Sequence, residues 1–496
     1  MALFSYKKTE LSLKIALFGI TFLFSLGFSL IGIDIHHHGL MFHGAMSFFS
    51  EEGILYKDFY FHYGPFTAIL QATSLFVFGK KLIALQYLTC IVYSIISVQL
   101  FSLNKLFFNT KTSLILVVFW LLMAPYLLWE FHPWSSVYII PFFIIIFQQL
   151  IKPNFKFSYL IIGVCVGMIF FFRQSSGIIC FLALLVMFIF ELKNKKSIQL
   201  LLGLLIVIST AFSYLVYQGN LNSFIYYGFQ GQKSMVIQGD GYIGIFMNIF
   251  FKLLKIVTND NWIIFVKDHK VPYLPYFNNL ILITFIIISS LKIIRFLFYR
   301  RTSRTKFYLV LFALASVSQF YPVPCMRHYY YAFTPIIPLF YYDIKILTGY
   351  LRIKKLKIIS RSVILIFFLL LLSNILVRLE VGIKRITDSD YKFRKLSKNH
   401  VLEGIRINSN DYIFVQEVGN LDGDSKIVLD PLKNPTPYLI PYLIKSKNDF
   451  RDKKSYYFIS DTIEFPKYTD STYNMFSNFG CYTPINNKLY YLKSNN

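Results

Sequence analysis

Apolar runs of bilayer-crossing length recur along the first 380 residues, and short polar or basic stretches separate them. About 20 predominantly apolar residues in a helix span the hydrocarbon core of a membrane. The pattern predicts about eleven transmembrane helices near 11–33, 82–103, 113–129, 137–151, 157–172, 177–192, 198–217, 278–294, 307–321, 329–345 and 360–378. Two further apolar runs are expected to lie in the membrane interface, at 66–79 and 242–257. A full crossing by either would move every later basic loop to the other side.

The basic loops give the orientation. With a cytoplasmic N-terminus, the clusters of lysine and arginine all fall on the inner side, as the positive-inside rule requires; they lie at 105–111, 152–156, 193–196, 292–306 and 345–361. The first apolar run is expected to be an uncleaved signal anchor. It is longer than the core of a signal peptide and lacks a small-x-small cleavage site.

Composition supports a membrane protein. The 496 residues are 55% hydrophobic and only 15% charged, too apolar for a soluble surface. The net charge of +25 lies in short clusters between apolar runs, where it orients helices and meets anionic lipid, so no nucleic-acid partner is expected. Four of the five cysteines lie in or beside apolar runs, which excludes a disulfide framework.

Composition changes after residue 380, because 13 of the 25 acidic residues follow it. The sequence predicts two parts: a transmembrane domain over 1–380, with a first external loop at 34–81, and a small soluble domain over 381–496. Within the second part we expect a helix and short strands in an α/β or α+β arrangement, at 391–405, 411–418, 425–429, 455–460 and 489–492. An odd number of spans places this domain outside the cytoplasm. The fold class is therefore an all-α polytopic membrane protein with a small extracytoplasmic domain.

Chemistry is concentrated where the chain first leaves the membrane. The stretch from Asp34 to Pro65 holds five of the nine histidines, and we interpret it as an active-site loop. Three more polar clusters follow outer ends of predicted spans: E-F-H-P-W at 130–134, R-Q-S-S-G at 173–177 and C-M-R-H-Y at 325–329. We expect them to converge on an external polar cavity. The alternative is that each cluster only anchors its helix in the head-group region.

Metal and nucleotide sites receive less support. Imidazole and carboxylate groups between Asp34 and His43 could ligate a divalent metal. Three consecutive histidines, His36 to His38, cannot all face one point on regular structure, so no metal ligand is assigned and a metal stays an alternative. The cytoplasmic side has no Gly-rich phosphate loop, which argues against nucleotide binding.

The first loop resembles a known family. An aspartate directly after the first span, histidines next, then G-I-L-Y-K-D-F-Y-F-H-Y-G-P at 53–65 and a short apolar helix are similar to the first external loop of GT-C glycosyltransferases. The nearest branch is the bacterial set related to protein O-mannosyltransferases and aminoarabinose transferases, and the resemblance covers about residues 10–345. It implies a sugar donor on a polyprenyl phosphate, used at the external face of the bacterial inner membrane.

The resemblance also implies roles for residues. Asp34 takes the position of the catalytic carboxylate, and Glu130 or Asp58 is expected to be its partner, because the residues beside Asp34 are isoleucine and histidine. The stretch R-H-Y-Y-Y-A-F-T-P-I-I-P at 327–338 is similar to the Arg/Tyr-rich end of a late span. Donor phosphate is therefore expected on Arg327, Arg173 and His328, and substrate on His37, His38, His62, Tyr63 and His132.

The chemical requirements of sugar transfer support the same function. Sugar transfer from a lipid phosphate needs a carboxylate near the acceptor hydroxyl, cations on the leaving phosphate and an apolar groove. The sequence predicts an integral-membrane glycosyltransferase acting on a cell-envelope glycan, lipid or protein, such as lipopolysaccharide or surface polysaccharide. Two alternatives stay open. A lipid-linked glycan polymerase or ligase would centre on a large late loop, and a transporter or flippase of lipid-linked sugars would show mid-membrane ionisable sites or a repeat.

Overall fold

A computed structural model describes most of the predicted membrane part and four short strands after it. The described residues are 2–29, 41–42, 44–49, 54–56, 61–80, 82–128, 133–153, 156–192, 195–230, 274–297, 303–320, 326–350, 411–415, 455–459, 482–484 and 489–493. The predicted span 360–378, the interfacial helix 242–257 and the strand 425–429 lie outside them.

Three described helices are long and apolar enough to cross a membrane, at Glu10–Ser29, Ile83–Asn104 and Lys195–Tyr217. They belong to α1 (Ala2–Ser29), α4 (Leu82–Asn104) and α9 (Lys195–Tyr217). The helical class is confirmed for the described membrane part. The count of eleven spans and the orientation stay predictions.

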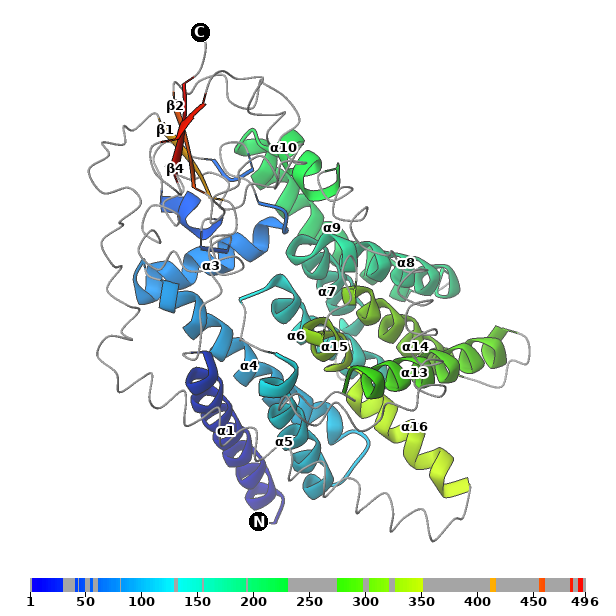
Figure 1. The fold of residues 1–496 in the computed structure, drawn as a ribbon. Coiled ribbons are helices and arrows are strands. Elements are labelled where there is room, and N and C mark those ends of the chain that lie inside the picture. Colours follow the sequence, from blue (N-terminus) through cyan, green and yellow to red (C-terminus); the bar gives the residue numbers. More distant parts are fainter. Residues whose placement is uncertain are drawn as a thin grey trace, which may run out of the picture.

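Other helices complete the bundle. They are α3 (Pro65–Phe78), α5 (Thr110–Leu127), α6 (Ser135–Ile151), α7 (Ser158–Phe172), α8 (Gln174–Phe190), α10 (Leu221–Ile225), α13 (Leu274–Leu297), α14 (Arg304–Val317), α15 (Met326–Phe333) and α16 (Ile337–Tyr350). Short turns of other helix types lie at η1 (Ser47–Phe49), η2 (Tyr226–Gln230) and η4 (Ser318–Phe320). In Figure 1, α1 lies beside α4, and α7, α8, α9 and α14 form a second group.

One predicted helix is wrong. The run 329–345 was expected to be a single span, but it is divided between α15 and α16 by a turn at 334–336. Pro335 explains the break, because proline has no backbone N–H and restricts the residue before it. The break leaves a separate short helix, α15, whose first turn carries Arg327 and His328.

Helix α1 shows how the bundle is stabilised. Thr21, Ser25 and Ser29 recur every four residues, lie on one face and are buried, while the large side chains Ile15 and Leu23 are 65% and 69% exposed. In water this distribution would be unfavourable, because apolar area would stay solvated. In a bilayer it is ordinary, since lipid is as apolar as leucine and small residues allow close helix contacts.

Helices α7 and α9 make a close backbone contact at their glycines. A Cβ atom on Gly163 would overlap the carbonyl group of Leu200, and one on Gly203 would overlap that of Leu160. Gly167 likewise faces Val207 at a distance that leaves no room for a methyl group. Glycine at these positions lets the two backbones touch, as small residues do in membrane helix pairs.

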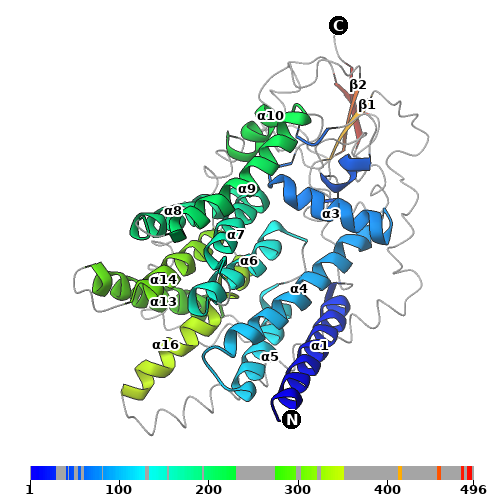
Figure 2. The same cartoon turned by 180° about the vertical axis from the view of Figure 1, so that it is seen from behind.

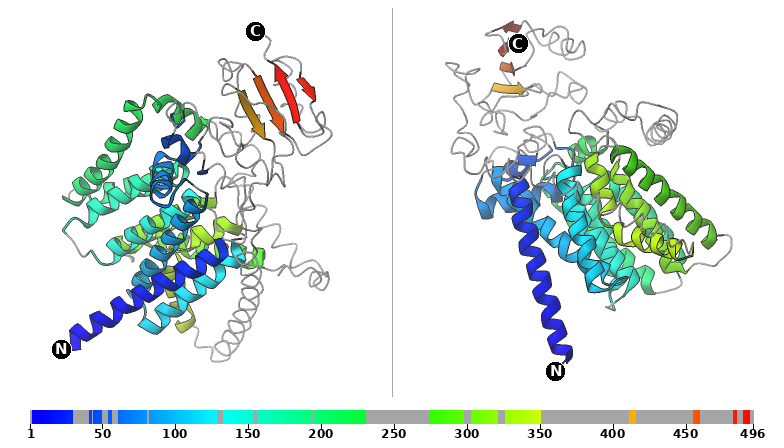
Figure 3. Two further views of the ribbon diagram at one scale, coloured as in Figure 1. Left: turned by 90° about the vertical axis from the view of Figure 1, so that its left-hand side faces the viewer. Right: turned by 60° about the horizontal axis from the view of Figure 1, so that its bottom comes forward.

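The four strands form one mixed sheet in the order β1-β2-β4-β3. Strand β1 (Asp411–Val415) pairs in parallel with β2 (Ser455–Ile459). Strand β4 (Leu489–Lys493) is antiparallel to both β2 and β3 (Tyr482–Pro484). The sheet lies at the end of the molecule opposite the N-terminus of α1 in every view (Figures 2 and 3). The domain boundary at residue 380 stays a prediction.

Candidate functional site

The start of α6 is the point where several helix ends meet. Trp134 precedes the helix and has an extended backbone, and it offers no side-chain cap to the first turn. The first N–H groups of a helix have no acceptor within the helix, and they carry the positive end of its dipole. Ser135 and Ser136 in this first turn are fully buried. A polar, electropositive helix end is thus enclosed within the protein.

Arg173 reaches this helix end from the junction of α7 and α8. It is the single residue between the two helices, and its extended backbone (φ −146°, ψ 99°) separates them. The side chain is only 6% exposed. Its Nη1 donates to Ser136 Oγ, and its Nη2 donates to the carbonyl oxygen of Gln319 in η4 at 3.2 Å. Arg173 therefore links α6, the α7–α8 junction and the end of α14.

Arg327 and His328 approach the same helix start from α15. The Arg327 guanidinium lies 5.7 Å from the centre of the Trp134 ring, within the range of a cation–π contact. The His328 ring lies 5.5 Å from the Trp134 ring and is buried. The structure thus brings together described members of all three polar clusters, at residues 134–136. Whether the arginines and His328 bind phosphate stays a prediction.

A hydrogen-bonded aromatic clamp holds α15 in place. Trp120 of α5 stacks on Tyr330 with 5.7 Å between ring centres. Trp120 Nε1 donates to Thr334 Oγ1 at 2.9 Å, and Thr334 Oγ1 donates to the carbonyl oxygen of Tyr330 at 2.6 Å. The Tyr330 hydroxyl donates back to the carbonyl oxygen of Trp120 at 3.3 Å. This clamp fixes the helix that presents Arg327 and His328.

The end of the first loop is attached to the α7–α8 junction. The Gly64 N–H donates to the carbonyl oxygen of Phe172 at 3.2 Å, and Thr67 Oγ1 donates to the same oxygen at 3.0 Å. The N-terminus of α3 therefore meets the C-terminus of α7, where the two helix dipoles attract. His62 and Tyr63, two predicted substrate residues, precede this contact with their rings 4.0 Å apart.

Tyr56 and Asn220 hold the middle of the loop, and sequence reasoning missed both. The Tyr56 hydroxyl donates to the carbonyl oxygen of Tyr63 at 2.6 Å, and Asn220 Nδ2 donates to that of Leu55 at 2.8 Å. Tyr56 is fully buried with a φ of 68°, a left-handed conformation that costs about 1–3 kcal/mol outside glycine. Burial raises the pKa of Tyr56 well above its usual value, so the side chain stays a neutral donor.

The other predicted site residues lie outside the described part of the chain: Asp34, Asp58, Glu130, His37, His38 and His132. Within the described residues no three His, Cys, Asp or Glu side chains gather into a metal site.

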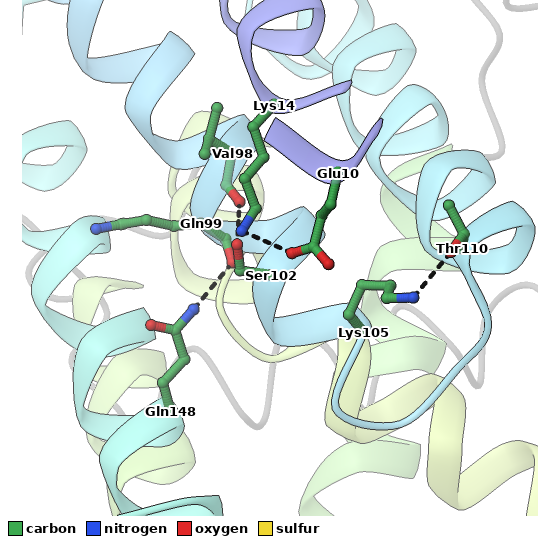
Figure 4. Close-up of polar contacts among 8 residues, drawn as sticks. All are labelled: Glu10, Lys14, Val98, Gln99, Ser102, Lys105, Thr110 and Gln148. Atoms are coloured by element: carbon green, nitrogen blue, oxygen red, sulfur yellow. Dashed lines mark hydrogen bonds and ion pairs between the residues drawn. The ribbon is translucent and has the colours of Figure 1, made fainter. Parts of the chain in front are cut away.

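The acidic side chains that are described pair elsewhere. Lys14 Nζ lies 2.8 Å from Glu10 (Figure 4), Lys292 Nζ lies 2.6 Å from Asp343, and Arg304 Nη1 lies 3.7 Å from Glu191. The Tyr308 hydroxyl also donates to Glu191 at 3.0 Å.

Comparison with protein-family models finds no match to this chain. Comparison with curated proteins finds none either.

Proposed function

We propose that this chain is an integral-membrane glycosyltransferase. It takes a sugar from a polyprenyl-phosphate donor and transfers it to a glycan, lipid or protein of the cell envelope, on the external face of a bacterial inner membrane. The observation that carries the proposal is the meeting of buried Arg173 with Arg327 and His328 at the N-terminus of α6.

The leaving group of such a reaction is a lipid phosphate, and this site suits it chemically. Guanidinium groups donate paired, charge-assisted hydrogen bonds to phosphate oxygens. A helix N-terminus adds N–H donors and a partial positive charge. Donors that are already oriented in a buried site stabilise a developing anion more than they would in water. Arg173 is the better oriented of the two arginines, because its side chain is fixed by two elements of the fold.

The lipid part of the donor also has suitable surroundings. Large apolar side chains face outward along α9, among them Ile198, Ile206 and Val216. Such a surface accepts either lipid tails or a prenyl chain. A lipid-linked donor can therefore rest its prenyl chain against the bundle from the bilayer.

The roles that the first-loop resemblance implies complete the proposal. Asp34 is the general base or orients the acceptor, with Glu130 or Asp58 as its partner. Five further side chains contact the sugar or the acceptor: His37, His38, His62, Tyr63 and His132. No cofactor is assigned, and a divalent metal would be compatible with the histidines.

The test uses the purified full-length protein in lipid nanodiscs. A panel of undecaprenyl-phosphoryl sugars is supplied with an envelope glycolipid extract, and release of undecaprenyl phosphate is measured. We expect release with at least one sugar, and a loss of about a hundredfold or more in Asp34→Asn. Asparagine keeps the size and capping ability of aspartate, so insertion should stay normal. Absence of release with every donor would contradict the proposal.

A further inference from the structure

Five buried polar atoms on α3, on η4 and in the first turns of α6 and α8 have no hydrogen-bond partner within the described residues. They are Gln71 Oε1, Ser135 Oγ, Gln174 Nε2, Ser176 Oγ and Gln319 Oε1. Their residues are at most 2% exposed. Leaving a buried polar group without a partner is unfavourable, so such atoms call for a bound water or ligand.

Four of these atoms belong to the elements that Arg173 connects, and Gln71 of α3 bonds to the carbonyl oxygen of Pro133, next to the start of α6. Gln174 follows Arg173 in the chain, and Ser176 is two residues further along the first turns of α8. Ser135 adjoins Ser136, which accepts from Arg173, and Gln319 accepts from Arg173 through its backbone. We call these five residues the polar layer.

The hydrogen bonds of two glutamines fix which atom is free. Gln71 Nε2 donates to the carbonyl oxygen of Pro133 at 2.8 Å, and because a carbonyl cannot donate, the unpartnered atom is the amide oxygen. Ser316 Oγ donates to the carbonyl oxygen of Ala332 at 2.8 Å, so it accepts from Gln319 Nε2 at 3.4 Å. Gln319 therefore also presents an amide oxygen.

Amide oxygens accept hydrogen bonds and never donate them. A phosphate without protons brings no donor, so it cannot satisfy Gln71 or Gln319. A hydroxyl group can satisfy them, and it can also accept from Gln174 Nε2. Arg173 favours an anion, whereas the polar layer favours hydroxyl groups. The ligand that meets both demands is a sugar joined to a phosphate.

We infer that the polar layer binds the sugar of the donor and recognises its free hydroxyl groups. This inference rests on the proposed function and narrows its substrate class. The transferred sugar carries unsubstituted hydroxyls near the phosphate, and deoxy or O-alkylated sugars bind more weakly. The atoms are closed off from water in this structure.

The test measures binding of three probes to the full-length protein in nanodiscs. They are undecaprenyl phosphate, undecaprenyl-phosphoryl glucose and its 2-deoxy analogue, each followed by native mass spectrometry. A fourth probe with mannose in place of glucose covers the other common stereochemistry. In the wild type we expect the best hydroxylated sugar probe to bind at least about tenfold more tightly than its deoxy analogue or undecaprenyl phosphate.

The variants are Gln319→Met and Gln174→Met, which keep side-chain length and remove the amide. We expect each to leave binding of undecaprenyl phosphate within about twofold and to lower the preference for the hydroxylated sugar by about tenfold. Two variants are used so that one that fails to fold does not decide the outcome. The control is Gln99→Met: Gln99 also has a buried amide oxygen without a partner, but it lies near the C-terminus of α4 beside Lys14 and Glu10 (Figure 4).

The outcomes separate the two claims. If the wild type binds no prenyl-phosphate probe and transfers no sugar, the proposed function fails and the inference fails with it. If the wild type transfers sugar but the glutamine variants keep its preference, the inference alone is wrong. If Gln319→Met weakens the binding of all probes equally, the polar layer holds buried water and has only a structural role. That result would also overturn the inference.

Discussion

The α7–α9 contact and the start of α6 lie in the same helical bundle and are built in opposite ways. At the contact, Gly163 and Gly203 let two backbones touch with no side chain between them. At the start of α6, long polar side chains from the α7–α8 junction and from α15 meet Trp134 and Ser136. The first arrangement depends on close packing of two backbones, and the second depends on polar and aromatic side-chain contacts. Changes at the first should therefore affect folding, and changes at the second should affect ligand binding.

The largest effect on the folded protein is expected from Gly203→Ala. The added methyl group meets the Leu160 backbone, which cannot move aside as a flexible side chain would. We expect a loss of about 3 kcal/mol or more and little monodisperse protein on size-exclusion chromatography in detergent. Gly19→Ala is the control, because nothing lies within 4 Å of a Cβ atom there. Equal yields for the two variants would show that the α7–α9 contact is looser than described.

Thr334→Val should have the next largest effect. It removes the acceptor of Trp120 Nε1 and the hydrogen bond to Tyr330, and leaves a buried indole N–H without a partner. We expect a loss of about 1–3 kcal/mol in stability, seen as a lower melting temperature, together with weaker donor binding.

Thr210→Val is the matched control for Thr334→Val. Thr210 makes the same kind of bond to a carbonyl four residues earlier, at 2.8 Å, but on an exposed helix face. A drop in melting temperature without weaker donor binding would mean that the clamp stabilises the bundle and does not position Arg327.

Tyr56→Phe should have the smallest effect, about 1 kcal/mol, because one hydrogen bond to Tyr63 is lost and the ring packing stays. The effect should depend on pH. Burial raises the pKa of folded Tyr56, so its contribution is complete below about pH 10, where unfolded tyrosine is neutral, and is lost as the pH rises through the folded pKa.

Denaturation between pH 8 and pH 11 measures this dependence. The variant should lose less stability above pH 10 than the wild type, whereas Tyr217→Phe, whose tyrosine is 86% exposed, should follow the wild type. Identical pH profiles for wild type and Tyr56→Phe would contradict the role of the buried hydroxyl.

The sequence predicts much of the helical framework because apolar length is a local property. The predicted runs 82–103 and 198–217 agree closely with α4 and α9. The short run 66–79, predicted as too short to span, is the helix α3. The break between α15 and α16 was missed because the flanking residues stay apolar, although Pro335 was a visible signal.

The candidate site is less predictable from sequence because its contacts are long-range. Polar clusters at helix ends indicated that Arg173, Arg327 and Trp134 would approach one another, since outer ends lie at one level of a membrane. No local sequence pattern shows that Trp120 donates a hydrogen bond to Thr334, which lies 214 residues away. Asn220 likewise holds Leu55 across 165 residues. Only the three-dimensional arrangement reveals these supports.

The central claim is that the start of α6 binds the phosphate of a lipid-linked donor. The most direct test is the affinity of the purified protein in nanodiscs for undecaprenyl phosphate, compared between Arg173→Gln, Arg327→Gln and Arg295→Gln. Glutamine keeps hydrogen-bonding ability and removes the charge. Arg295 is an exposed arginine in the last turn of α13 and serves as the control.

We predict that Arg173→Gln and Arg327→Gln each weaken binding by about tenfold or more, since charge-assisted hydrogen bonds contribute roughly 1.5–3 kcal/mol. Arg295→Gln should stay within about twofold of the wild type. Unchanged affinity in both Arg173→Gln and Arg327→Gln, with all three variants folded, would contradict the account.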